Sequence, residues 1–330
     1  MAAMNGPSCV GALIRDKENR VYIQRRSLAR QQLPGAWDIV GGHVEAGEAP
    51  EGALAREIAE ETGWRLRRIE AVIADWTWTH NGVQQREVDY LVEVNGNLGE
   101  PRLEKGKHDK FWWIAYDNAE TVRTRYDAGN DALWTIITRA ARIRLTSGLR
   151  LEPIEAASTD ALNRLVRSGA VALGRRGVRE SEIPQMADGF GRLWDSGLGY
   201  NWLAYQRDAR QPVIGCGGVV YGQVNGADEL VLQCSVSSDR HGLDSAEDIV
   251  KAVLAFARNE LGAEQVFAFV QQRNHWTRDV LAGSGMVHFD TVQSTVGRAD
   301  AFVIRFLDDR SYDLDPKVVT GIGQIMALPN

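Results

Sequence analysis

Three glutamates stand at helical spacing in one stretch of this chain: Glu57, Glu60 and Glu61. At positions i, i+3 and i+4 of a helix, their carboxylates lie on one side of about one turn. Like charges placed in this way repel one another unless water or a cation neutralises them. Mg²⁺ and Mn²⁺ prefer oxygen ligands, so either ion would suit this cluster. The other interpretation is a solvated acidic helix face.

The flanking residues predict the element that positions these glutamates. Gly41 and Gly42 indicate a tight turn. A helix is then expected to begin near Pro50 and to end at Thr62, with Gly63 as a left-handed cap. Its buried side is predicted to be an apolar stripe formed by Ala53, Leu54 and Ile58.

The full stretch fits the pattern G-x5-E-x7-R-E-U-x-E-E-x-G-U, in which U is a bulky apolar residue. The matching residues are Gly42, Glu48, Arg56, Glu57, Ile58, Glu60, Glu61, Gly63 and Trp64. This pattern resembles a complete Nudix box, the signature of the Nudix hydrolases. The resemblance implies an α/β/α sandwich that cleaves the diphosphate linkage of a nucleoside diphosphate derivative.

The resemblance also implies roles for single residues. Glu57, Glu60 and Glu61 would be catalytic residues and metal ligands, and one of them could act as general base. The Gly41 carbonyl would be a further ligand of Mg²⁺ or Mn²⁺. The residues expected to support the geometry of the loop and helix are Gly42, Glu48 and Arg56, with Arg56 pairing with Glu48.

Residues outside the box could complete the site. A further acid or base could come from Glu104, His108 or Asp109, although for each of them alone the sequence favours a solvated loop residue. Arg25 and Arg26 could contact phosphate or lie on the surface.

Two tryptophans, Trp76 and Trp78, alternate with polar residues along a predicted strand. They could stack on a nucleobase, but the sequence favours packing in the core. The substrate is left open among nucleoside triphosphates, ADP-ribose, nucleotide sugars and dinucleoside polyphosphates.

Composition bounds the class of protein. The chain has 330 residues, 44% hydrophobic and 25% charged, with a net charge of −6. This length suits two domains, and the negative charge argues against duplex nucleic acid as a partner. No apolar run is long enough to span a membrane. The three cysteines are far apart and favour free thiols in a reducing cytoplasm: Cys9, Cys216 and Cys234.

The domain boundary is predicted at a linker over 146–150, between a first domain at 1–145 and a second at 151–308. A tail follows at 309–330, acidic and then mildly apolar. It could pack on either domain or at a contact between copies of the chain, so a homo-oligomer is one expectation.

The second half resembles the GNAT acetyltransferases, which have a mixed-sheet α/β fold. The family's pattern N-x-x-[ST]-x-x-[VL]-[LY]-x-x-x-G-[FM] matches at Asn274, Thr277, Val280, Leu281, Gly285 and Met286. The resemblance implies acetyl-CoA as cofactor and a small amine as acceptor. The residues that would bind the cofactor are Val236, Gly242, Ala246 and Asn274.

The segment that should bind the pyrophosphate of the cofactor departs from the family pattern [QR]-x-x-G-x-[GA]. It reads His241 to Ala246, with Asp244 where glycine is expected. A side chain there blocks close approach, and a carboxylate repels pyrophosphate. The alternative is that Asp244 caps a helix. Leu281 stands where many members carry a tyrosine acid, and Glu229 is either a base or an exposed strand end.

Three hypotheses follow. In the first, a Mg²⁺-dependent Nudix pyrophosphohydrolase is fused to a GNAT-like N-acetyltransferase. In the second, the acetyltransferase is the main activity and the Nudix half is accessory. In the third, the GNAT-like half is a non-catalytic binding or dimerisation module.

Overall fold

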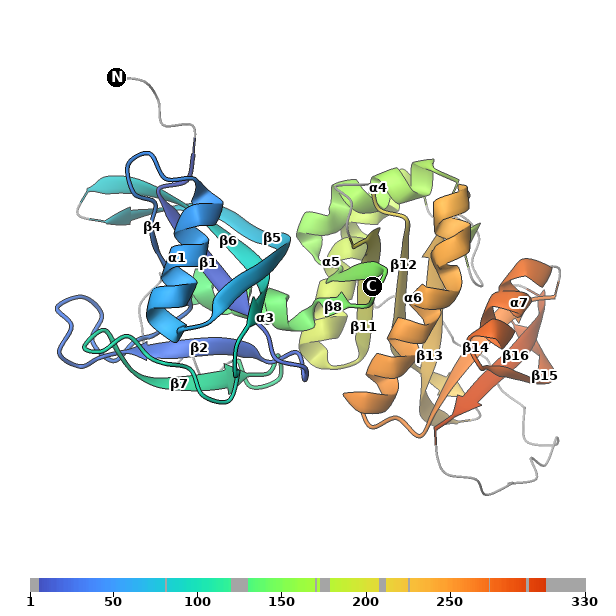
Figure 1. Cartoon of the computed structure of the whole chain (residues 1–330). Coiled ribbons are helices and arrows are strands. Elements are labelled where there is room, and N and C mark those ends of the chain that lie inside the picture. The colour runs from blue at the N-terminus through green and yellow to red at the C-terminus, as the bar shows by residue number, and fades with distance from the viewer. Residues whose placement is uncertain are drawn as a thin grey trace. The chain divides into compact units, whose positions relative to one another are not determined.

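The computed structural model describes residues 6–80, 82–119, 130–169, 171–172, 179–207, 212–224, 226–272, 274–294 and 297–306. The predicted tail, 309–330, lies outside these ranges. The chain divides into two compact units between Ile143 and Arg144. Each unit is described by itself (Figure 1).

The first unit carries the box helix α1 and two small sheets. Its elements are β1 (Cys9–Ile14), β2 (Val21–Arg26), β3 (Trp37–Asp38), β4 (Val40–His43), α1 (Pro50–Thr62), β5 (Arg65–His80), β6 (Val83–Asn95), β7 (His108–Ile114) and α3 (Asn130–Arg142). One sheet has the order β4-β1-β6-β5, and the other has the order β3-β2-β7. Figure 1 shows α1 lying against the first of these sheets.

Helix α1 forms as its sequence predicts. It begins at Pro50, and Gly63 ends it with φ of 72°, a left-handed conformation that favours glycine. The predicted apolar stripe is fully buried: Ala53, Leu54 and Ile58. It packs in one core cluster with residues from β1 and β4. Burying a side chain such as Leu54 contributes about 1.5–3 kcal/mol, so this face fixes the helix on the sheet.

The strand register places the glycine pair beside β1. Gly41 lies opposite Gly11 and Gly42 lies opposite Val10 in the antiparallel β1–β4 pair. On its other side, β1 runs parallel to β6. Strands β5 and β6 form a long antiparallel hairpin, and Gly82 in its turn has φ of 77°. The neighbouring Asn81 of the predicted turn lies outside the described residues.

The second unit is built on one mixed sheet. Its strands are β8 (Arg144–Leu145), β9 (Leu149–Pro153), β10 (Val171–Ala172), β11 (Gly199–Gln206), β12 (Gly215–Val224), β13 (Ala227–Val236), β14 (Gln265–Gln271), β15 (Val287–Ser294) and β16 (Gly297–Arg305). Its helices are η1 (Ala156–Ser158), α4 (Thr159–Arg167), η2 (Glu180–Glu182), α5 (Ile183–Ser196), α6 (Arg240–Asn259) and α7 (His275–Gly283). The sheet order is β15-β16-β14-β13-β12-β11-β9-β8, and β10 pairs with β13.

Two local features of this unit bear on function. Strands β13 and β14 are parallel and share a single register pair, Val231 with Phe267, whereas β12 and β13 pair along their whole length. In the predicted linker, the Thr146 amide donates to the Leu149 carbonyl at 2.9 Å, which makes a turn between β8 and β9.

Among the described residues, no helix combines the length and the apolar character that crossing a membrane requires. The three cysteines are free thiols, and Cys9 and Cys234 are buried.

Candidate active site in the first unit

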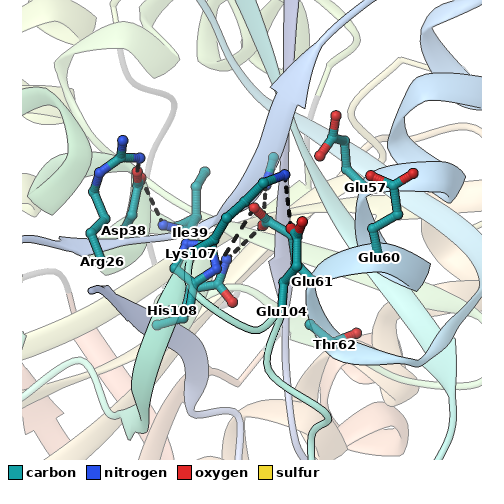
Figure 2. Close-up of polar contacts among 12 residues, drawn as sticks. Arg26, Asp38, Ile39, Glu57, Glu60, Glu61, Thr62, Glu104, Lys107 and His108 are labelled. Atoms are coloured by element: carbon teal, nitrogen blue, oxygen red, sulfur yellow. Dashed lines mark hydrogen bonds and ion pairs between the residues drawn. The ribbon is translucent and has the colours of Figure 1, made fainter. Parts of the chain in front are cut away.

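The three glutamates of α1 have different surroundings. Glu57 and Glu61 are buried, with 8% and 5% of their surface exposed. The Glu60 side chain is 48% exposed. Figure 2 shows Glu57 and Glu60 pointing the same way and Glu61 turned toward the side chains that precede and begin β7. The cluster therefore has a solvent-facing part and a buried part.

The Glu61 carboxylate is held by one oxygen. Its Oε2 atom accepts hydrogen bonds from Gln24 Nε2 at 2.6 Å and from the Gly41 amide at 3.2 Å. Its Oε1 atom faces His108 Nδ1 at 3.8 Å, which is beyond hydrogen-bond distance. The hydrogen bonds from Gly41 and Gln24 lower the pKa of Glu61, but burial has the larger effect and raises it to about 8. This carboxylate is therefore fixed in direction and poorly solvated, so a cation would stabilise it.

Gln24 is a site residue that the sequence did not reveal. It lies on β2 and is fully buried, and its Oε1 atom has no hydrogen-bond partner among the described residues. Nothing in its local sequence marks it, because its contact with Glu61 joins two segments that are distant along the chain. Its strand, VYIQRR, ends in two arginines, so a polar residue at this position does not stand out.

Gly42 makes room for Glu57. A β-carbon on Gly42 would lie 2.5 Å from Glu57 Cδ, closer than non-bonded carbon atoms approach. The glycine therefore lets the buried carboxylate sit directly against the β4 backbone.

Arg56 ties the loop to the helix. Its Nε and one terminal nitrogen each lie 3.1 Å from an oxygen of Glu48, and that nitrogen also donates to the His43 carbonyl at 3.0 Å. Its other terminal nitrogen lies 2.6 Å from Glu57 Oε1. The hydrogen bond to Arg56 holds the pKa of Glu48 below its usual value. The predicted pair between Arg56 and Glu48 is present, in the bidentate geometry typical of arginine with a carboxylate.

The donor atoms suit a hard divalent cation. Within the described ranges, no three His, Cys, Asp or Glu side chains are already gathered closely enough to hold a metal ion. Mg²⁺ usually takes one or two protein carboxylates and completes its shell with water and substrate phosphates, so it does not need such a cage. The poorly solvated Glu61 and the buried Glu57 supply carboxylate oxygens of this kind, and the residues fit the ion.

The three candidates for a further acid or base, Glu104, His108 and Asp109, have different surroundings in the structure. His108 is not a solvated loop residue, because it begins β7 and is 7% exposed beside Glu61. Burial lowers its pKa to about 4, so the imidazole is neutral at physiological pH. Glu104 is paired with Lys107, a residue that the sequence did not indicate, with 2.9 Å between Oε2 and Nζ. Figure 2 places both beside Glu61. Asp109 instead pairs with Arg25.

Arg25 and Arg26, which the sequence left as phosphate contacts or surface residues, each pair with a carboxylate. Arg25 forms a bidentate pair with Asp109, at 2.8 and 2.9 Å. Arg26 lies 3.3 Å from Asp38 Oδ2. The structure thus gives each of them a protein partner.

Trp76 and Trp78 are not core residues, which corrects the favoured interpretation of the sequence. Both are half-buried on β5, and each indole N–H donates to an acid on β6. Trp76 Nε1 lies 2.7 Å from Asp89 Oδ2, and Trp78 Nε1 lies 2.7 Å from Glu87 Oε2. The alternation along the strand was visible in the sequence, but the polar partners on the neighbouring strand were not.

The acids Glu87 and Asp89 form a carboxyl pair. Burial, the closeness of the two groups and the nearby Asp38 raise the pKa of Glu87, and burial raises that of Asp89. Asp89 is fully buried. Two neighbouring buried carboxyl groups are most stable when they share one proton.

In the second unit, the cap of α6 differs from the expected one. Asp239, not Asp244, is the N-cap, and its side chain accepts from the Gly242 amide at 2.9 Å. Asp244 lies in the second turn, is exposed, and pairs with Arg240 at 3.3 Å. The helix starts earlier than the alternative required, so Asp244 cannot cap it.

The residues predicted to bind acetyl-CoA are positioned as follows. Val236 ends β13 and is buried, and Ala246 is buried inside α6. Gly242 packs on Ser237, where a β-carbon would lie 2.8 Å from the Ser237 amide nitrogen. Asn274 caps α7 by accepting from the Thr277 amide at 3.2 Å.

The amides that would hold a pyrophosphate do not form an open site. The Asp239 carboxylate occupies the Gly242 amide and also the His241 amide. In this conformation the N-terminus of α6 does not offer these two amides to a pyrophosphate. Glu229 accepts from Gln265 Nε2 at 2.8 Å. Leu281, at the place of the family's tyrosine, is fully buried.

Comparison with known proteins agrees with this division into two units. A model of the NUDIX domain matches residues 7–133, and a model of the acetyltransferase (GNAT) domain matches residues 149–287. The chain is a Nudix domain followed by a GNAT domain. The prediction of two α/β domains, the first Nudix-like and the second a GNAT-like mixed sheet, is confirmed.

The Nudix–GNAT chain is similar to parts of several known proteins. It is 45% identical over 51 residues to an 8-oxo-dGTP diphosphatase of Proteus vulgaris, covering 16% of this chain and 45% of that protein. It is 35% identical over 107 residues to an octanoyltransferase of Myxococcus xanthus, covering 30% of this chain and 28% of that protein. It therefore spans less than half of the length of either relative.

Among solved structures, the chain is similar to the ribosomal-protein-S5-alanine acetyltransferase of Vibrio fischeri. The two are 11% identical, with a TM-score of 0.42, over 49% of this chain and 96% of that chain.

Proposed function

We propose that the Nudix domain is a Mg²⁺- or Mn²⁺-dependent pyrophosphohydrolase. Its substrate would be a nucleoside diphosphate derivative or a (deoxy)nucleoside triphosphate. The observation that carries this proposal is Glu61, whose Oε2 atom is fixed by Gln24 and the Gly41 amide, whereas Oε1 accepts no hydrogen bond from the residues that the structure describes. A carboxylate held by one oxygen is oriented to offer the other to a ligand or a water.

The residues that would hold the metal are Glu57, Glu60, Glu61 and the Gly41 carbonyl. When bound, the ion neutralises charge on the phosphates and lowers the pKa of an attacking water. Glu57 or Glu61 would accept the proton of that water, because both carboxylates are buried against the β4 backbone. Arg56 would hold the loop in its position relative to the helix through its hydrogen bonds to Glu48 and to the His43 carbonyl.

The linkage that is cleaved belongs to a nucleotide. This part of the proposal is supported by the Nudix match and by the similarity to the diphosphatase of Proteus vulgaris. The same domain would exclude duplex nucleic acid because the chain carries a net negative charge. A cytoplasmic location and a homo-oligomeric state stay predictions from the sequence.

A screen of diphosphate cleavage by the full chain, in which chromatography separates each substrate from its nucleotide product, tests the proposal. It would cover nucleoside triphosphates, oxidised dGTP, ADP-ribose, nucleotide sugars and CoA, with and without Mg²⁺. The expected result is turnover of one class that stops when EDTA is added. Metal-independent turnover, or none on any of these compounds with metal bound, would contradict it.

For the GNAT domain, we propose acetyl-CoA as ligand and a small amine as acceptor. The observation in its favour is the single register pair between β13 and β14, which lets the two strands diverge. Asp239 would have to leave the Gly242 amide to admit a pyrophosphate. Calorimetric titration of the full chain with acetyl-CoA tests this, and the absence of binding would favour a non-catalytic module.

A further inference from the structure

One ammonium group lies close to the acids of the Nudix site. Lys107 immediately precedes β7, and its Nζ atom is 2.9 Å from Glu104 Oε2. Figure 2 shows these two side chains beside Glu61. The hydrogen bond to Glu104 and the charges of Glu104, Glu61 and Glu57 raise the pKa of Lys107. The group is therefore charged over the whole physiological range of pH.

The arginines around the site are differently engaged. Arg56 is held by Glu48, Glu57 and the His43 carbonyl at once. Arg25 and Arg26 are paired with Asp109 and Asp38. Moving any of these guanidinium groups would break contacts that hold the loop or the β-strands. These three side chains are therefore poorly placed to leave their protein partners and bind a phosphate group of the substrate.

Lys107 is free to move by comparison. Its side chain is 41% exposed, and the pair with Glu104 is its one ion pair among the described residues. A partly exposed pair of this kind contributes about 0–1 kcal/mol, so exchanging it for another anion costs little. The four-carbon stem of lysine also allows the ammonium to shift without a change in the backbone.

A mobile ammonium group such as that of Lys107 suits the binding of a diphosphate. The oxygens of a triphosphate or of free pyrophosphate carry more negative charge than one divalent ion neutralises, and in any diphosphate charge builds up on the leaving phosphate as the linkage breaks. Charge-assisted hydrogen bonds from lysine are a common way of binding phosphate. Arg56 is already occupied by Glu48 and Glu57, and the three glutamates of α1 are carboxylates, which repel the substrate.

We propose that Lys107 binds a phosphate group of the substrate, exchanging its contact with Glu104 for a contact with a phosphate oxygen. This inference rests on the proposed pyrophosphohydrolase function. It assigns the phosphate contact to a residue from the β7 side of the site instead of Arg25 or Arg26, for which the sequence left this role open. The ligand class is a diphosphate, whichever nucleoside carries it.

The test compares Lys107→Met with Lys105→Met in the full chain. Lys105 is an exposed lysine of the same loop, so the two variants lose the same charge from the domain. Calorimetry would measure the affinity for inorganic pyrophosphate in the presence of Mg²⁺. Kinetics would give kcat and KM for the best nucleotide of the screen. Melting curves, and Lys107→Gln as a second variant, guard against loss of the fold.

Lys107→Met is expected to weaken pyrophosphate binding and to raise KM by about tenfold to a hundredfold, the range for a lost hydrogen bond to a charged group. Lys107→Arg should restore part of the affinity, and Lys105→Met should stay within about twofold of the wild type. Equal affinities in Lys107→Met and Lys105→Met would overturn the inference. Pyrophosphate binding is read without turnover, so an inactive wild type would count against the proposed function alone.

Discussion

Gly42 and Glu57 are packed so closely that the Nudix site has no room for a side chain at position 42. A β-carbon there would lie 2.5 Å from Glu57 Cδ. Glu57 is buried and is also held by Arg56. The glycine is therefore required by the position of a carboxylate and not by a turn in the backbone.

Gly42→Ala should displace Glu57 and lower kcat by about tenfold or more, since small misplacements of catalytic groups have effects of this size. Gly52→Ala is the matched control. Gly52 lies inside α1, and a β-carbon there would meet nothing closer than Glu48 Cγ at 3.5 Å. It should keep activity and gain up to about 1 kcal/mol of stability from helix propensity. Steady-state kinetics and urea unfolding would check both, and full activity in Gly42→Ala would refute the steric argument.

Gln24→Leu should lower kcat with little change in KM. The substitution removes the donor that lies 2.6 Å from Glu61 Oε2, so the carboxylate loses its orientation although the side-chain volume is nearly kept. A hydrogen bond to a charged group is worth about 1.5–3 kcal/mol, which corresponds to a loss of about tenfold to a hundredfold. Gln84→Leu, at an exposed position of β6, is the control. A rise in KM at constant kcat would show that Gln24 acts on the substrate instead.

Glu87→Gln should change how stability depends on pH. The folded protein keeps a proton on the pair of Glu87 and Asp89 that the unfolded chain releases above about pH 4.3. The pair's contribution to stability is therefore complete below that pH and is lost as the pH rises through the raised pKa of the pair. Between about pH 5 and about pH 8, which both lie in this window, the variant should therefore lose less stability than the wild type.

Thermal melting across this range measures the effect. Asp75→Asn is the control, because the pKa of Asp75 is lowered by its hydrogen bond to Arg86. Its contribution has the opposite sign: it is present above the unfolded pKa and is lost as the pH falls. Parallel melting profiles for the wild type and Glu87→Gln would mean that the carboxyl pair holds no extra proton.

Asp239→Ala should destabilise the GNAT domain by about 0.5–2 kcal/mol, the usual cost of removing an N-cap. Asp244→Ala should cost less than about 1 kcal/mol, because it removes an exposed ion pair with Arg240. Urea unfolding of the full chain would compare the two variants. A larger effect at position 244 would contradict the assignment of the cap.

The sequence was sufficient for features that are local along the chain. The box helix, its apolar stripe and the Gly63 cap depend on residues within about four turns of each other, and all three form as predicted. The pair of Arg56 with Glu48 was also predicted, because the box places both residues at fixed spacing.

Features that join distant segments could not be predicted. Gln24 reaches the site from β2 and Lys107 from the residue before β7, and no local pattern there points to the site. His108 was one of three candidates that the sequence could not separate, because its contact with Glu61 joins distant segments. The partners of Trp76 and Trp78 depend on the register of the β5–β6 hairpin, which the sequence does not fix. The choice between Asp239 and Asp244 depended on a helix start, which sequence patterns locate only to within a few residues.

The central claim is that the acids of α1 hold a metal ion for hydrolysis of a diphosphate linkage. The most direct measurement is formation of the nucleotide product from the best substrate as Mg²⁺ is titrated, for the wild type, Glu60→Gln and Glu61→Gln. We predict saturable dependence on Mg²⁺ in the wild type and losses of several orders of magnitude in kcat in both variants, with unchanged melting curves. Turnover like that of the wild type in both variants would contradict the account.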